Sequence, residues 1–167
     1  ELFNRIDFEL DEIGTPIPFR WGKCKLATAS YGHGITTTPL QLAKAYSIIG
    51  NGGYKIKPTL IKNNQGIKFQ EQVISNKTSN QLNTILRKVV SNEEGTANFA
   101  NIEGYEVAGK TGTALKYNSK EKINTFVSLF PASNPKYVLV VLLDEPKIAE
   151  PDHIFVRPDG KKYKNIK

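Results

Sequence analysis

Two β-rich segments, 125–130 and 137–143, are joined by only six residues. Both are rich in Val, Thr, Phe and Tyr, and the connection contains Ser133-Asn134-Pro135-Lys136, a typical turn sequence. So short a connection does not join neighbouring parallel strands, which need a crossover of about a dozen residues or more. The sequence therefore predicts an antiparallel hairpin in the sheet, and similar composition predicts a further strand over 105–114.

Helices are predicted upstream of these strands. Segment 38–50 begins with Thr38 as N-cap, Pro39 at the first helical position and Gln41 completing a capping box. A second helix is predicted over 79–90. Apolar residues recur at i, i+3, i+4 and i+7 in both: Leu42, Ala45, Tyr46, Ile49 and Leu82, Ile85, Leu86, Val89. Helices followed by neighbouring strands indicate an α+β or mixed α/β fold, with helices packed on the sheet.

The length of 167 residues suits one domain, 1–167, and 39% hydrophobic residues can supply its core. Residues 1–20 mix charge with glycine and proline and are expected to form an extended lead-in, as in a piece of a longer protein. The longest apolar run, 138–143, is far shorter than the roughly 20 residues of a membrane helix. We therefore expect any membrane anchor to lie outside this chain.

Charge and cysteine content narrow the classes of function. The net charge is +7, but the last seven residues contribute four of those charges, and the rest of the chain carries +3. No aromatic and basic motif of a nucleic-acid module accompanies the charge, so no nucleic-acid partner is expected. The single Cys24 excludes an internal disulfide and a multi-cysteine metal site. We expect neither a metal nor a cofactor.

Residues Gly104 to Ala114, GYEVAGKTGTA, match two incompatible motifs. The first is the phosphate loop, with Gly104, Gly109, Lys110 and Thr111 at its fixed positions. The apolar strand that ends in Asp144-Glu145 resembles the acidic strand end that holds magnesium in nucleotide hydrolases. Because two features coincide, we compare the segments on either side of the motif with those that a phosphate loop requires.

A phosphate loop follows a buried strand and opens a helix, so that backbone N–H groups converge on the phosphates. The upstream segment 93–103 is polar and interrupted by glycine, and the downstream segment 112–124 has no helical apolar stripe. The short 130–137 connection also contradicts the parallel sheet of such enzymes. A nucleotide hydrolase is thus kept only as a minor alternative.

The second motif is Lys110-Thr111-Gly112-Thr113 on a strand. Strand alternation places Lys110 and Gly112 on one face and the two threonines on the other. Gly112 leaves room for the backbone of a ligand, and an edge strand can pair with an extended peptide. The threonine hydroxyls are suited to a carboxylate, the Lys110 ammonium to a positive field, and the Thr113 N–H to an oxyanion.

Residues 29–61, ASYGHGITTTPLQLAKAYSIIGNGGYKIKPTLI, resemble a characteristic segment of class B penicillin-binding proteins. This segment precedes the Lys-Thr-Gly motif of the same family in the usual order, and 126–146 resemble the closing strands. Agreement is densest with the division-specific branch. Segment 93–97, Glu-Glu-Gly-Thr-Ala, also resembles a family loop near the site, but we assign it no chemistry.

The resemblance implies the penicillin-binding and β-lactamase-like transpeptidase fold, incomplete in this chain. It also implies a peptidoglycan D,D-transpeptidase that joins stem peptides through a serine acyl-enzyme, binds β-lactams and works with cell-division proteins. Its place would be the periplasmic face of the bacterial inner membrane. Lys110, Thr111, Gly112 and Thr113 would bind substrate, with Lys110 supporting catalysis. A catalytically silent peptide-binding module of the same fold is the main alternative.

The nucleophile of this family lies in Ser-x-x-Lys at the start of a buried helix, where the lysine falls one turn away. The pattern occurs here at Ser119 to Lys122, in a polar connection, and at Ser133 to Lys136, in the predicted turn. Both follow Lys-Thr-Gly, whereas the family order places the nucleophile before it, and Ser-x-Asn is absent. We therefore expect the nucleophile to precede Glu1, and the chain alone to be inactive.

Overall fold

The computed structural model describes residues 5–10, 22–62, 64, 66, 68–116, 119–147, 154–156 and 160–164. Of the expected lead-in 1–20, only 5–10 are described, and they contain no helix or strand. The helices are α1 (Lys25–Ala29), α2 (Pro39–Gly50), α3 (Asn76–Ser91) and the 3-10 helix η1 (Asn98–Ala100). The strands are β1 (Tyr54–Ile56), β2 (Phe69–Gln72), β3 (Ala108–Leu115), β4 (Lys122–Phe130), β5 (Tyr137–Asp144), β6 (Ile154–Val156) and β7 (Lys162–Lys164).

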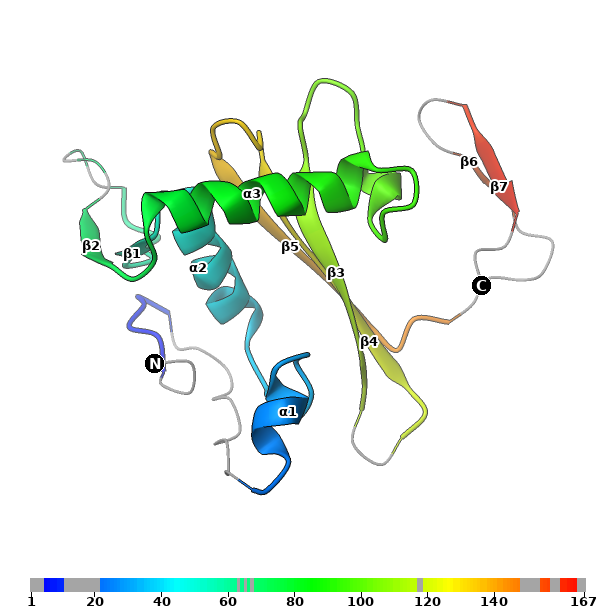
Figure 1. Cartoon of the computed structure of the whole chain (residues 1–167), viewed down its shortest axis with the longest axis horizontal. Coiled ribbons are helices and arrows are strands. Elements are labelled where there is room, and N and C mark those ends of the chain that lie inside the picture. Colours follow the sequence, from blue (N-terminus) through cyan, green and yellow to red (C-terminus); the bar gives the residue numbers. More distant parts are fainter. Residues whose placement is uncertain are drawn as a thin grey trace.

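The main sheet has the order β3-β4-β5, and both strand pairs are antiparallel. Phe130 pairs with Tyr137 at the β4–β5 turn, which the Lys136 N–H closes by donating to the Phe130 carbonyl at 3.1 Å. This confirms the antiparallel hairpin predicted from the short connection. Two small antiparallel hairpins, β1–β2 and β6–β7, were not predicted, and β6–β7 lies apart from the main sheet (Figure 1).

Helix α2 begins as its capping residues predict. The Thr38 hydroxyl accepts a hydrogen bond from the Gln41 N–H at 3.2 Å, and Oε1 of Gln41 accepts one from the Thr38 N–H at 2.9 Å. After the helix, Asn51 exchanges two 2.8 Å hydrogen bonds with the backbone of Tyr54. Gly53 then has φ 99°, and a Cβ there would lie 1.9 Å from the Ile74 carbonyl oxygen. Only glycine permits this close crossing.

Helix α3 is longer than the apolar periodicity indicates. It starts at Asn76, three residues before the predicted Ser79, because the Ser75 hydroxyl caps it by accepting from the Thr78 N–H at 3.1 Å. The additional first turn is polar, so periodicity alone misses it. The Ser79 hydroxyl, almost fully buried, donates to the Ile49 carbonyl and joins α3 to the end of α2.

The core forms where α3 packs on the sheet. Val90 of α3, Ala97 and Val107 form a buried cluster against which Phe126 and Phe130 of β4 pack. Leu129, on the other face of β4 by strand alternation, is fully buried, and a Cβ on Gly50 of α2 would approach it within 3.1 Å. Helix α2 thus lies on the face of β4 opposite to the one that packs on the Val90 cluster.

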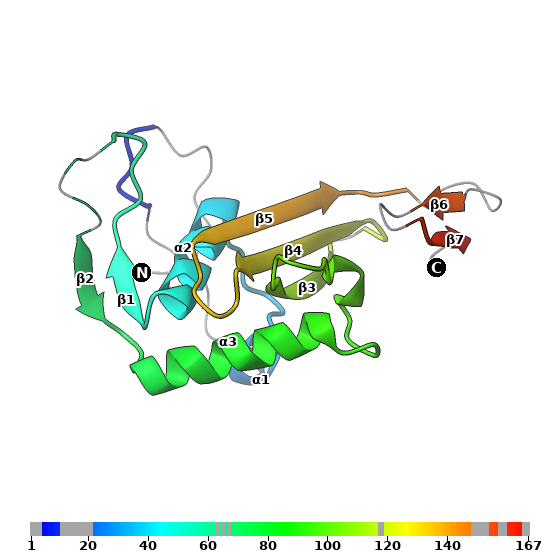
Figure 2. The ribbon, with the colours of Figure 1, turned by 90° about the horizontal axis from the view of Figure 1, so that it is seen from above.

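Figure 2 shows β3, β4 and β5 side by side, with α3 running along the β3 side of the sheet. The helix therefore lies next to the strand that carries the Lys-Thr-Gly motif. Within the described residues, none of the helices has both the length and the apolar character needed to cross a bilayer.

Candidate functional site

Strand β3 carries the whole Lys110 to Thr113 motif at the border of the main sheet. It pairs with β4 on one side only, where Lys110 is opposite Val127 and Thr113 is opposite Asn124. Among the described strands, none pairs with the other edge of β3. The strand starts at Ala108, later than the predicted Tyr105, because Glu106 has φ 48° in the turn that precedes it. The motif therefore lies on an open strand edge.

This geometry is incompatible with a phosphate loop. Gly109, Lys110 and Thr111 belong to an extended strand that continues to Leu115, and the next described element is β4, not a helix. Backbone N–H groups in a strand alternate in direction and do not converge on one phosphate. The nucleotide-hydrolase alternative therefore lacks its structural basis.

The acidic pair considered for that alternative has another partner. Asp144 ends β5, and its Oδ1 lies 2.8 Å from Nζ of Lys116, which also contacts the Glu145 carboxylate. The hydrogen bonds that the Lys116 ammonium donates to the Asp144 and Glu145 carboxylates raise the pKa of Lys116 above its usual value. These ion pairs were not predicted from the sequence, and they join the end of the β3–β4 hairpin to the end of β5.

The Lys110 side chain is exposed and its ammonium donates to the Thr111 carbonyl oxygen at 2.8 Å. Gly112 is exposed too, and a Cβ added to it would meet no heavy atom nearer than the Thr125 carbonyl oxygen at 4.0 Å. The chain itself does not demand glycine at this position. The free space suits the close approach of another backbone.

Thr111 is half-buried and its hydroxyl donates to Oγ1 of Thr96 at 3.2 Å. Thr96 belongs to the loop between α3 and η1, for which no chemistry was predicted from the sequence. The contact joins residues fifteen positions apart in the chain. No local sequence signal reports such a contact, because it depends on how α3 is placed beside β3.

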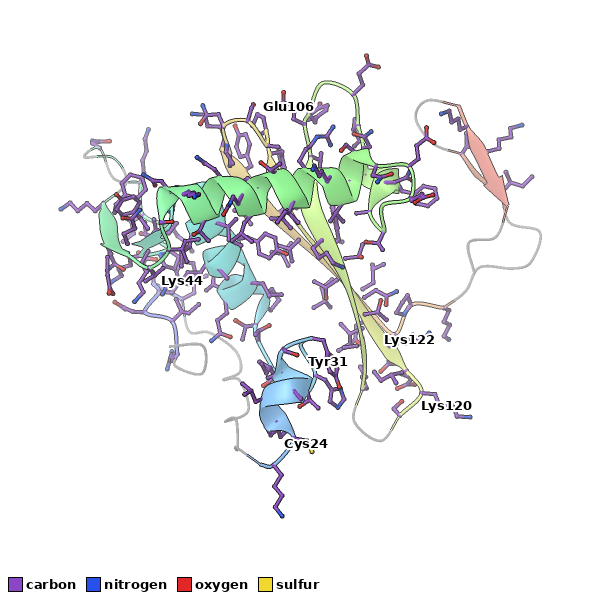
Figure 3. The ribbon with its side chains drawn as sticks, in the orientation of Figure 1. Cys24, Tyr31, Lys44, Glu106, Lys120 and Lys122 are labelled. Atoms are coloured by element: carbon purple, nitrogen blue, oxygen red, sulfur yellow. The ribbon has the colours of Figure 1, made fainter. Side chains whose placement is uncertain are left out.

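Hydrogen bonds from α3 and from the β4–β5 turn hold the segment that leads into β3. Nη1 of Arg87 on α3 donates to the Val107 carbonyl at 2.7 Å, and Nη2 donates to Oδ1 of Asn101 at 3.0 Å. Hydrogen bonds from the side chain and backbone of Ser133 lower the pKa of Glu106. Figure 3 labels Glu106 at the start of β3 and Lys120 and Lys122 at the opposite end of the β3–β4 hairpin.

Neither Ser-x-x-Lys pattern has the setting of a nucleophile. Ser119 lies in the β3–β4 connection, where its hydroxyl donates to the Glu121 carboxylate at 3.1 Å and accepts from the Glu121 N–H. Ser133 lies in the β4–β5 turn, and its N–H donates to the Glu106 carboxylate at 3.2 Å. Neither serine opens a helix, so neither has a lysine one helical turn away.

No group of three or more His, Cys, Asp and Glu side chains in the described ranges is arranged to hold a metal ion. Along the open edge of β3 the motif offers backbone groups, two hydroxyls and one ammonium. Such a set is suited to binding a peptide and a carboxylate.

Comparison with known proteins identifies the family. The model of the penicillin-binding protein transpeptidase domain matches residues 4–164. The chain is 35% identical over 153 residues to the probable peptidoglycan D,D-transpeptidase FtsI of Caulobacter vibrioides, covering 83% of this chain and 26% of the relative. It is 36% identical over 159 residues to stage V sporulation protein D of Bacillus subtilis, covering 85% of this chain and 24% of the relative.

Solved structures give the same result. The transpeptidase domain of penicillin-binding protein 3 from Burkholderia pseudomallei superposes with a TM-score of 0.79 at 31% identity, covering 87% of this chain and 46% of that one. A peptidoglycan glycosyltransferase from Burkholderia ambifaria gives a TM-score of 0.77 at 33% identity, again covering 87% of this chain and 46% of that one.

The chain spans about a quarter of the length of these curated relatives, from 24% to 26%. The expected transpeptidase fold, incomplete in this chain, is confirmed by the solved structures. The relatives named FtsI support the division-specific branch that the resemblance indicated. This chain belongs to the penicillin-binding protein transpeptidase domain family.

Proposed function

We propose that this chain is part of a peptidoglycan D,D-transpeptidase that cross-links stem peptides through a serine acyl-enzyme and is inhibited by penicillin. The observation that carries the proposal is the open edge of β3 with Lys110 to Thr113 along it. A stem peptide that pairs with this edge places its backbone over Gly112, where nothing in the described chain occupies the space.

The four motif residues take different roles in this proposal. The hydroxyls of Thr111 and Thr113 bind the terminal carboxylate of the peptide, because hydroxyls donate well to anions. The Lys110 ammonium adds positive potential and supports catalysis, and the Thr113 N–H stabilises the oxyanion of the tetrahedral intermediate. These groups bind and polarise the scissile carbonyl but do not attack it.

The attacking serine belongs, in this proposal, to a part of the protein that precedes residue 1. The support is the setting of Ser119 and Ser133, neither of which opens a helix. The complete protein would act in septal wall synthesis with other division proteins. It would be anchored in the bacterial inner membrane by a segment outside this chain, with its transpeptidase domain in the periplasm.

Penicillin labelling tests the proposal. The complete protein is incubated with benzylpenicillin, and intact and peptide mass spectra are recorded. We expect one stable acyl adduct on a serine outside residues 1–167, and none on the isolated chain. A catalytically silent peptide-binding module would form no adduct in either sample. A stable adduct on Ser119 or Ser133 would contradict the assignment of the nucleophile.

A further inference from the structure

Thr96 is placed beside the motif strand by a tightly connected turn. Gly95 packs so closely on the end of α3 that a Cβ there would lie 2.1 Å from the Val89 carbonyl oxygen. The Gly95 N–H donates to the Asn92 carbonyl at 2.9 Å, and Nδ2 of Asn98 donates to the Glu93 carbonyl at 3.0 Å. Hydrogen bonds on both sides of Thr96, one between backbone groups and one from the Asn98 side chain, therefore hold its position.

The residue after Thr96 fixes the turn to the core. Ala97 is 4% exposed and packs with Val90 of α3 and with Val107, just before β3. The helix, the turn and the start of β3 thus share one buried cluster. A side chain on this turn keeps a defined position relative to β3, and the Thr96 hydroxyl lies 3.2 Å from that of Thr111.

This hydroxyl pair has little value for stability. Thr96 is exposed, and an exposed hydrogen bond exchanges a protein partner for water with a small net gain. Its position is nevertheless defined by the buried Ala97 on one side and by the close packing of Gly95 on the end of α3 on the other. The contact therefore contributes little to the stability of the fold, and its effect falls on the orientation of the Thr111 hydroxyl.

We propose that Thr96 is a positioning residue for the carboxylate of the substrate, acting through Thr111. The proposal rests on the proposed function, in which Thr111 binds that carboxylate. It adds a residue outside the motif, on a different element of the fold, to the recognition of the peptide terminus.

Binding of a carboxylate can reverse the direction of the hydrogen bond between the two hydroxyls. Each hydroxyl has one proton to donate and lone pairs to accept. In this structure Thr111 donates to Thr96. A carboxylate only accepts, so when it binds, the Thr111 proton turns to it and Thr96 donates its own proton to Oγ1 of Thr111. Linked hydrogen bonds of this kind strengthen each other.

The experiment compares two ligands on the complete protein. Second-order acylation rates are measured with benzylpenicillin, which carries a free carboxylate, and with its methyl ester, which does not. We expect Thr96→Val to lower the ratio of the two rates, free acid over ester, by about tenfold, because the bond from Thr111 to the carboxylate loses the linked hydrogen bond that strengthens it. Thr96→Ser keeps the hydroxyl and should retain the ratio of the unaltered protein within about twofold.

Matched variants separate positioning from general damage. Thr84→Val removes another hydroxyl from the exposed side of α3, where it donates to the Asn80 carbonyl, and should not change the ratio. A distorted fold would slow both ligands equally, and Thr96→Ala replaces Thr96→Val if the latter does not fold. An unchanged ratio in the hydroxyl-free variant would overturn this inference alone. Absence of acylation in the unaltered protein would overturn both this inference and the proposed function.

Discussion

The two parts of β3 differ in what surrounds them. Ala108 and Gly109 at its start are buried, whereas Lys110 and the residues from Gly112 to its end are exposed. Helix α3 stabilises the first part, because Arg87 donates a hydrogen bond to the carbonyl of Val107, directly before the strand. The second part pairs with β4 and, at Thr111, also contacts Thr96 in the loop after α3. One strand thus has a packed start that fixes its position and an open continuation that is available to a ligand.

Two glycines three positions apart show this difference most clearly. A Cβ on Gly109 would lie 2.6 Å from the Val127 carbonyl oxygen and 2.9 Å from the Phe126 ring. A Cβ on Gly112 would reach no heavy atom within less than 4.0 Å. Gly109 is therefore required by the fold, whereas the described chain gives no steric reason for Gly112. In the proposed function, the reason for Gly112 is the approach of a ligand backbone.

The largest effect is expected from Lys110, in the open part. Lys110→Met removes the ammonium without touching the core, so we expect acylation of the complete protein by benzylpenicillin to slow by about a hundredfold. The thermal unfolding midpoint should change no more than it does on substitution of other exposed residues. A rate close to that of the unaltered protein would remove Lys110 from the site, and a large fall in the midpoint would contradict the division of β3 into two parts.

The glycine pair gives the next largest effect. Gly109→Ala forces a methyl group against the paired strand, and we expect a loss of about 1–3 kcal/mol in the free energy of unfolding. Gly112→Ala should change it by less than about 0.5 kcal/mol while lowering penicillin acylation. Urea unfolding of both variants of the complete protein measures the first quantity, and acylation rates measure the second. Equal destabilisation by the two alanines would show that the distinction is wrong.

Arg87→Ala tests how the packed part is held. The substitution leaves the Val107 carbonyl, in a residue only 8% exposed, without its 2.7 Å donor. We expect the free energy of unfolding to fall by about 1 kcal/mol. Lys88→Ala, at the exposed neighbour on the same helix, serves as the matched control and should be near neutral. A neutral Arg87→Ala variant would mean that α3 is positioned by the apolar cluster alone.

The smallest effect is expected at Lys116, at the far end of β3. Its carboxylate partners are half-exposed, so Lys116→Gln should lower the unfolding midpoint only slightly, and salt should weaken the difference. The pKa of Lys116 is raised in the folded state, so its contribution is complete below the unfolded pKa and is lost as the pH rises above it. Unfolding midpoints of the unaltered protein and of Lys116→Gln are compared at neutral and at strongly alkaline pH. The difference between them should be smaller at alkaline pH.

Much of the fold follows from local patterns in the sequence. Capping residues and apolar spacing place α2, and the six-residue connection requires the β4–β5 hairpin. Element starts are less predictable, since the first turn of α3 is polar and β4 begins at Lys122, three residues before the predicted Thr125. Those residues gain their structure from a cap or from pairing with a neighbouring strand.

The candidate site could be predicted only where its residues are consecutive. Lys110 to Thr113 form one motif, so their alternation on a strand can be read directly from the sequence. The Thr96 contact with Thr111 depends on the length of α3 and on the buried turn at Ala97. The Lys116 ion pairs likewise depend on the sheet bringing β5 beside the β3–β4 hairpin. Such contacts between distant residues have no local signature.

The open edge of β3 has a consequence for how copies of the protein meet one another. An unpaired strand edge is a template for any extended chain, including the same edge of a second molecule, and can start sheet-to-sheet aggregation. Lys110 lies exposed on that edge, so two copies that approach edge to edge bring like charges together. The ammonium that is suited to attract a peptide carboxylate is thus equally suited to keep neighbouring molecules apart.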